Sequence, residues 1–173
     1  MKTKLMLTAI VLNCMTLCFG QQNQQKEKWN WLIGEWKGEG DGQTGKGGGT
    51  FSIKPDLDNK VLIRRNHAEY PATATQPKVV HDDLMIVYND ISGAPSNAIY
   101  FDNEGHTINY TISYADKSIM LTSDKQPNTP VFRLTYTLND AGSISVKFDM
   151  SRDGEKFTTY TEGKCTKVEK NNK

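Results

Sequence analysis

The chain has 173 residues, of which 21 are basic and 20 are acidic, so its formal net charge at pH 7 is only +1. This balance argues against a protein that binds nucleic acid or an anionic membrane mainly through charge. The length fits one domain with a substantial hydrophobic core.

The first 20 residues have the pattern of a signal peptide. Lys2 and Lys4 form a basic start, residues 5–17 are mostly apolar, and Cys18-Phe19-Gly20 places small residues where a signal peptidase cuts. We expect cleavage before Gln21 and an exported protein, either periplasmic or secreted. The residue before each cysteine of this segment is larger than a lipoprotein signal requires, which disfavours a lipid anchor. The apolar run is too short to span a membrane.

Without residues 1–20 the chain keeps 153 residues, 19 basic and 20 acidic side chains, and Cys165 as its single cysteine. An internal disulfide is then impossible, so stability must come from packing and strand pairing. An exported protein without disulfides fits a bacterial envelope protein. We expect a polar tether over 21–28, one folded domain over 29–169 and a polar tail over 170–173.

Short strands dominate the folded domain. Trp29 to Ile33 is predicted to form one short helical turn that caps one end, and no later window keeps a helical apolar period. Asn103-Glu104-Gly105 is predicted to be a three-residue hairpin, with glycine where a positive φ is needed. Alternation and turn residues predict strands over 35–42, 48–53, 60–70, 83–88, 98–102, 106–114, 118–123, 131–138, 143–150 and 156–167.

Connections this short predict antiparallel pairing between strands that follow one another in the chain. The strands over 131–138 and 143–150 alternate cleanly, which indicates one buried face and one wet face. A sandwich satisfies the same pattern, but a meander without long return connections favours closure, because closure removes exposed edges. We therefore predict an all-β protein, a closed antiparallel barrel of about ten strands. A barrel interior that its own side chains do not fill holds a ligand.

The strand over 61–70 is apolar in its first half and densely polar in its second. These polar residues either form a charged rim or lie inside the barrel, where they orient a ligand. We expect Arg65 and His67 to face inward, paired with Glu69 or Asp83, because a buried charge without a partner is very costly. In that case replacing Arg65 with methionine should abolish ligand retention and leave the fold intact. The alternative is that the opposite face points inward, with Arg64, Asn66 and Tyr70.

Other candidate site residues lie on neighbouring strands. His106 shares a face with Tyr110 that looks buried, although a lone histidine there is more often a core residue than a ligand contact. Arg133 lies opposite the face of Phe132, and arginine is seldom placed inward without a partner. The predicted ligand site takes its polar anchor from Arg65, His67, His106 and Arg133, its carboxylate partner from Asp83, and its wall from Trp36, Tyr110 and Phe132.

The sequence motifs of several kinds of binding and catalytic site are missing. The three histidines are 14 and 25 residues apart, with no cysteine pair, so we predict no metal site. Residues 40–47 resemble a phosphate loop, but glycine replaces its final Ser or Thr and no helix follows. No nucleophile motif or catalytic cysteine is apparent. An enzyme that uses His67 or His106 as a base inside the barrel is the alternative to a binding protein.

Gly34-x-Trp36 followed by about ten strands resembles the calycin superfamily of lipocalins and fatty-acid-binding proteins. Residues 64–71, 81–85 and 100–106 are similar to an uncharacterised group of bacterial lipocalin-like secreted proteins. The resemblance covers the region from Trp29 to Lys167 and implies a lipocalin-like β-barrel. The barrel and its polar strand residues predict a carrier of a small apolar or amphiphilic molecule. Charge and hydropathy predict that neither nucleic acid nor an integral membrane segment is involved.

The ligand-binding residues of two more distantly similar groups are present only in part. The haem-binding nitrobindins share the opening Leu32-x-Gly34-x-Trp36 and the barrel, but a histidine near their C-terminus holds the iron. This chain has no histidine after His106, so haem is disfavoured and we predict no cofactor. Fatty-acid-binding proteins hold a carboxylate with an Arg-x-Tyr pair on the last strand. Here Tyr160 is present, but Thr158 replaces the arginine.

Overall fold

The computed structural model describes residues 27–39, 48–72, 74, 77–91, 93–140 and 142–169. The predicted signal peptide over 1–20, most of the predicted tether and the predicted tail over 170–173 lie outside these residues. The phosphate-loop-like stretch over 40–47 lies outside them as well. Among the described residues, no helix is long and apolar enough to cross a membrane.

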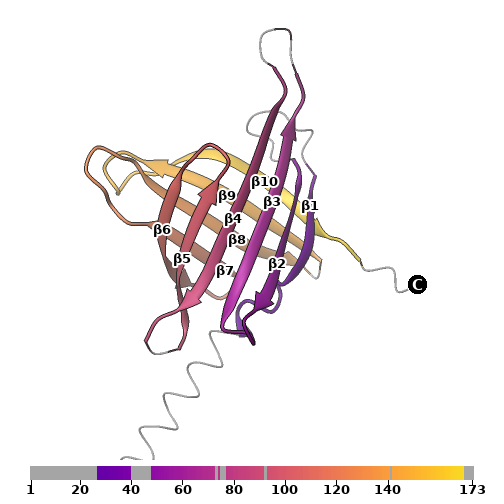
Figure 1. Ribbon diagram of the computed structural model, residues 1–173, viewed down its shortest axis with the longest axis vertical. Helices are drawn as coiled ribbons and strands as arrows, with labels where there is room; N and C mark the ends of the chain where they lie inside the picture. The colour runs from indigo at the N-terminus through magenta and orange to yellow at the C-terminus, as the bar shows by residue number, and fades with distance from the viewer. Residues whose placement is uncertain are drawn as a thin grey trace, which may run out of the picture.

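The described residues form a closed antiparallel barrel of ten strands, in which each strand pairs with its chain neighbours and β1 closes on β10 (Figure 1). The all-β closed barrel expected from the sequence is therefore confirmed. The strands are β1 (Gly34–Gly38), β2 (Thr50–Asp56), β3 (Val61–Tyr70), β4 (Val79–Asn89), β5 (Pro95–Asp102), β6 (Thr107–Tyr114), β7 (Ser118–Ser123), β8 (Val131–Asp140), β9 (Ser143–Ser151) and β10 (Thr158–Lys167).

β4 is longer than its predicted range. It begins at Val79, four residues before the predicted start, because His81 and Asp82 pair with Ala68 and His67 of β3. Polar residues that suggest a loop in the sequence are here strand residues. As a result, the paired ends of β3 and β4 rise beyond the other strands (Figure 1).

The hairpin between β5 and β6 has the predicted geometry. Gly105 adopts a φ of 90°, and its N–H donates to the carbonyl of Asp102 at 3.2 Å. Asn103 fastens the hairpin to β4, because its side-chain amide donates to the carbonyl of Val80 at 2.9 Å and its side-chain oxygen accepts from the N–H of Asp82 at 3.1 Å.

One end of the barrel is closed by the residues before β1. The N–H groups of Leu32 and Ile33 both donate to the carbonyl of Trp29, at 2.9 and 3.1 Å. These are hydrogen-bonded turns, and the predicted helical turn over 29–33 is not shown. Trp29 is only 1% exposed and lies in the hydrophobic core, where its indole N–H donates to the Tyr114 hydroxyl at 2.8 Å. We call this the Trp29 end, and the end with the β3–β4 and β5–β6 hairpins the polar end.

The inward face of β3 is the one that carries Arg64. Arg64 is 7% exposed, whereas Arg65 and His67 are exposed on the outer surface. The expectation that Arg65 and His67 face inward is therefore wrong. Arg64 pairs with Ile53 of β2 and Met85 of β4, which are both core residues, and side chains at paired positions share a face of the sheet. A one-residue difference in register reverses the face of every side chain in a strand.

Candidate ligand-binding site

Inward-facing side chains differ in exposure along the barrel. In the middle of the barrel and towards the Trp29 end most are buried, as at Trp36, Ile53 and Ile119, although Leu62 and Leu138 are partly exposed. Towards the polar end some are buried, as at Ala68 and Tyr110, and others are partly exposed although they point into the barrel. In a closed barrel, such side chains reach solvent only through an end. Solvent therefore reaches the partly exposed side chains of the polar half, which are Asn66, Tyr100, Ile108, Phe132, Phe148 and Met150.

Aromatic rings line one side of this polar half. Phe132 and Phe148 stack with ring centroids 5.7 Å apart, and Tyr160 meets Phe148 edge-on at 6.2 Å. Tyr160 is 58% exposed and lies at the register shift between Thr159 and Thr161 of β10. Such offset and edge-on pairs provide a rigid apolar surface. This aromatic wall leads from solvent into the barrel.

The interior also contains a buried ion pair. Arg64 Nη1 bonds to Asp83 Oδ1, and the two side chains are only 8% and 4% exposed. The guanidinium carbon lies 5.3 Å from the centroid of the Phe51 ring. The Tyr136 ring lies 6.0 Å from the same Phe51 ring. Arg64 and Tyr136 therefore contact a common aromatic residue in the middle of the barrel.

The groups around Arg64 are fixed in their protonation states. Burial disfavours the guanidinium charge, but the tyrosinate that Tyr136 forms at high pH and the Asp83 carboxylate more than offset it, so the pKa of Arg64 lies above its ordinary value. Burial raises the pKa of Tyr136 to about 12, and it raises the pKa of Tyr110 as well. At neutral pH Arg64 is therefore charged, and both tyrosine hydroxyls keep their protons and can donate.

Two donors in this region lack an acceptor. Arg64 Nε and the Tyr136 hydroxyl are buried without a hydrogen-bond partner, and in the described part of the chain only the Ser143 hydroxyl shares that state. Leaving a buried donor unpaired costs about 1–3 kcal/mol. The interior therefore contains two unpaired hydrogen-bond donors, on side chains that both contact Phe51.

A chain of polar side chains runs from the ion pair to the surface. His81 Nε2 lies 3.6 Å from Asp83 Oδ2 and 3.1 Å from the Tyr100 hydroxyl, while its Nδ1 lies 3.0 Å from Glu104. The Tyr100 hydroxyl donates to Asp102 Oδ2 at 3.2 Å. These contacts hold β4, β5 and the β5–β6 hairpin together at the polar end.

The titration of His81 should make stability depend on pH. Its hydrogen bond to Asp83, with a further one to Glu104, raises its pKa from 6.5 to about 9. A pKa raised on folding stabilises the folded state fully below pH 6.5, and this contribution is lost as pH rises to about 9. We expect the free energy of unfolding, measured in urea, to fall over that range and the fall to vanish in His81→Gln. An NMR titration that gives His81 its ordinary pKa would contradict this.

Some predicted site residues lie in this region. Asp83 faces inward and is the carboxylate of the buried pair, with Arg64 rather than Arg65 as its partner. Tyr110 is buried and inward-facing, and Phe132 belongs to the aromatic wall. Trp36 lies behind Phe51, with ring centroids 6.2 Å apart, and its indole N–H donates to the carbonyl of Leu32 at 2.8 Å.

The other predicted anchors lie elsewhere. His67 is on the outer surface, with Nδ1 2.6 Å from Asp82 Oδ1. The side chain of His106 is 62% exposed, and its Nδ1 lies 2.8 Å from Asp102 at the hairpin. His67 and His106 are therefore wrongly placed for the interior base that an enzyme would need. A histidine that already has a hydrogen-bond partner in a hairpin carboxylate has no energetic reason to be buried.

Arg133 also points outward. It bonds to Asp149 at 3.0 Å and lies over the Phe157 ring at 3.8 Å. Asp149 is buried on the outer face beneath these side chains and also accepts from the Thr159 hydroxyl at 2.9 Å. The partner expected for this arginine is therefore on the outside of the barrel, where it fastens β8 to β9 and β10.

Several side chains of the candidate site were not predicted from the sequence. Arg64 was predicted only as part of the alternative inward face, and no role in the site was predicted for Tyr136, Phe148 or the His81–Tyr100 pair. A usable signal existed in β8, where Tyr136 lies on the same alternating face as Phe132. Tyrosine in the middle of an apolar face predicts a buried hydroxyl, and a buried hydroxyl needs a partner.

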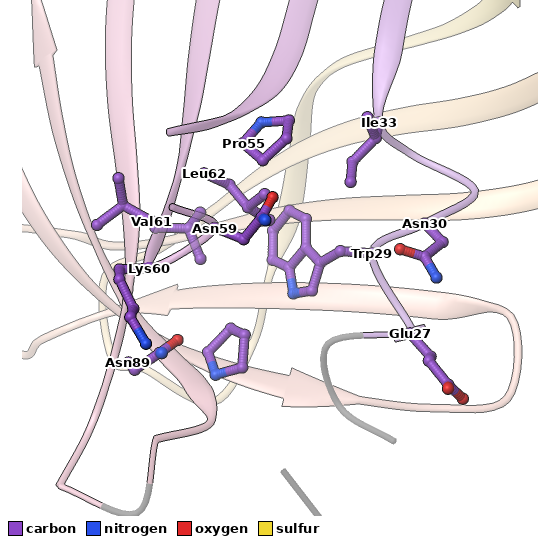
Figure 2. A pocket seen from close by; sticks show the side chains of 12 residues that line it. Glu27, Trp29, Asn30, Ile33, Pro55, Asn59, Lys60, Val61, Leu62 and Asn89 are labelled. Carbon is purple, nitrogen blue, oxygen red and sulfur yellow. The ribbon is translucent and has the colours of Figure 1, made fainter. Parts of the chain in front are cut away.

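A concave feature lies at the Trp29 end. It is a cavity of about 310 Å³, and Figure 2 shows the Trp29 indole amid its lining. Val61, Leu62 and Val87 contribute apolar surface, while Asn59 and Lys60 lie on the exposed turn before β3. The indole N–H is already bonded to Tyr114, so this side chain offers the cavity no unpaired polar atom. We assign the candidate site to the middle of the barrel, where Arg64 Nε and the Tyr136 hydroxyl lack an acceptor, and to the aromatic wall of the polar half.

The described residues also bear on metal and haem. They contain no group of three or more His, Cys, Asp or Glu side chains arranged to hold a metal ion. Of the three histidines, His81 is the one on an inward face, and both its ring nitrogens contact protein oxygens. It therefore has no nitrogen free for an iron ligand.

Comparison with known proteins adds no family name. Neither protein-family models nor curated proteins gave a match to this chain. The calycin resemblance therefore stays a prediction, which the closed barrel is compatible with.

Proposed function

We propose that this barrel binds a small amphiphilic molecule, with the polar head at Arg64 and Tyr136 and the apolar body along the aromatic wall. The observation that carries the proposal is the pair of buried donors without acceptors, Arg64 Nε and the Tyr136 hydroxyl. They lie in the interior of the barrel, and solvent reaches the partly exposed side chains of its polar half. A mostly apolar site with a few convergent polar groups is the usual form of a small-molecule site.

The free energies involved indicate that the hydrogen bonds of the polar head decide how tightly the ligand is held. Burying an apolar chain gains about 0.8 kcal/mol for each methylene. A chain of about ten carbons thus gains ~8 kcal/mol, which is comparable with the ~4–15 kcal/mol that association costs. Hydrogen bonds at the two unpaired donors supply the surplus. We further propose that the protein is exported and acts as a carrier, on the strength of the basic start and apolar run in residues 1–20.

Arg64→Met and Arg65→Met form a matched pair of variants that tests the site. Nile red is a suitable probe, because it is apolar, uncharged and carries a carbonyl acceptor. We expect Arg64→Met to weaken dye binding at least tenfold, which corresponds to about 1.4 kcal/mol. Arg65→Met should bind like the parent, because Arg65 is exposed on the outer surface. Fluorescence titration measures both affinities, and circular dichroism checks the fold.

Tyr136→Phe is the second variant, since Arg64→Met leaves Asp83 without its partner. This change removes the hydroxyl that lacks an acceptor and keeps the ring on Phe51. Weaker dye binding in folded Tyr136→Phe supports the site. If both interior variants bind Nile red as the parent does, the head group does not lie at Arg64 and Tyr136.

A further inference from the structure

We propose that the head group of the ligand is an uncharged hydrogen-bond acceptor, such as an ester or ketone carbonyl, and not a carboxylate. This inference rests on the proposed ligand-binding function and narrows the class of molecule. Two features carry it: the charge balance inside the barrel, and the donors that the ion pair leaves unused.

The charge of Arg64 is already neutralised. Its Nη1 bonds to Asp83, and both side chains are more than nine-tenths buried. Farther towards the polar end, His81 lies 3.6 Å from Asp83 and 3.0 Å from Glu104, and Asp102 lies 2.8 Å from His106. Three acidic and three basic side chains are thus paired with one another, and no positive charge among them is left over for an acidic ligand. A ligand carboxylate would add an unbalanced negative charge where solvent is scarce, which is strongly unfavourable.

Asp83 would repel a ligand carboxylate directly. Its carboxylate binds the same guanidinium that an acidic ligand would have to approach. Asp83 and Asp102 both act on the hydroxyls of Tyr100 and Tyr110, whose pKa values lie above the ordinary range chiefly because of burial and also because of these two negative charges. The potential that a head group meets beside Arg64 therefore does not favour an anion.

The unused donors suit a neutral acceptor. Arg64 Nε has one N–H and Tyr136 one O–H to give, and both are buried without a partner. A carbonyl oxygen has two lone pairs and can accept from both donors at once. A carbonyl therefore removes the free-energy cost of two unpaired donors without adding charge. A hydroxyl oxygen also has two lone pairs, but it brings an O–H donor that needs an acceptor of its own.

Methyl decanoate and decanoate test this inference, since they share a chain and a carbonyl and differ in the methyl cap and the charge. Displacement of Nile red from the protein at pH 7.5 gives an affinity for each. We expect methyl decanoate to bind at least tenfold more tightly than decanoate. In Asp83→Asn, which keeps an oxygen near Arg64 but removes the negative charge, the preference should shift towards decanoate by at least tenfold. Asp82→Asn is the matched control, because Asp82 lies outside on β4 and should leave the preference unchanged.

The outcomes separate the two proposals. Tighter binding of decanoate to the parent protein, or an unchanged preference in folded Asp83→Asn, overturns the uncharged head group and leaves ligand binding intact. Failure of the parent protein to bind Nile red and both decanoyl compounds overturns the binding function itself. If Asp83→Asn does not fold, the comparison of the two compounds on the parent protein decides the inference alone.

Discussion

Replacing Asp83 with alanine is expected to lower the free energy of unfolding by about 3–5 kcal/mol, the usual cost of leaving one member of a buried ion pair without its partner. The Arg64 guanidinium would remain in the middle of the barrel with no carboxylate beside it. Its charge cannot be lost by deprotonation at any ordinary pH. Denaturation in guanidinium chloride, followed by circular dichroism, measures the loss.

Asp82→Ala is the natural control for this change. Asp82 precedes Asp83 on β4, but its side chain is exposed and pairs with His67 on the outer surface. Exposed ion pairs contribute about 0–1 kcal/mol, so Asp82→Ala should change stability little. The double variant Arg64→Met with Asp83→Leu should regain most of the loss, since apolar groups often replace a buried ion pair without cost. Equal stability of Asp83→Ala and Asp82→Ala would contradict the interior placement of the pair.

Replacing Gly49 with alanine is expected to destabilise the barrel by about 2–5 kcal/mol, the sum of a positive-φ cost and an overpacking cost. Gly49 precedes β2 with a φ of 110°. A Cβ there would lie 2.3 Å from the carbonyl oxygen of His67 and 2.9 Å from Ala68 Cα. Both contacts are with the backbone of β3, which cannot move aside without disturbing its own pairing.

Gly105→Ala separates the clash from the backbone strain. Gly105 also has a positive φ, of 90°, but a Cβ there would meet nothing within 4 Å. Only the strain remains, about 1–2 kcal/mol. Thermal unfolding of both variants should therefore show a clearly larger loss for Gly49→Ala. A loss for Gly105→Ala as large as that for Gly49→Ala would show that the contact with β3 is not the cause.

The fold could be predicted because its signals are local. Turn residues and clean alternation on β8 and β9 mark antiparallel strands within a few residues of one another, and the hairpin at Gly105 needs only its own sequence. The end of β3 and the start of β4 were harder, because His81 and Asp82 have the composition of a loop. They are strand residues only because β3 extends to pair with them.

The inward face of β3 could not be predicted, because its first half is apolar on both faces. Leu62 and Ile63 point in opposite directions, yet both are partly buried, so hydrophobicity does not distinguish the two faces. In β4, Met85 and Val87 are the buried pair, although their neighbours Leu84 and Ile86 are just as apolar. The register that joins Arg64 to Ile53 and Met85 is a long-range property of the closed barrel.

The most direct test of a ligand head at Arg64 and Tyr136 is a crystal structure of the protein purified without detergent from its native cells. We predict electron density for an organic molecule, with one acceptor atom about 2.7–3.2 Å from both Arg64 Nε and the Tyr136 hydroxyl. Its apolar body should lie along Phe132 and Phe148. A lone water bonded to these two donors, with protein side chains filling the rest of the interior, would contradict the proposed function.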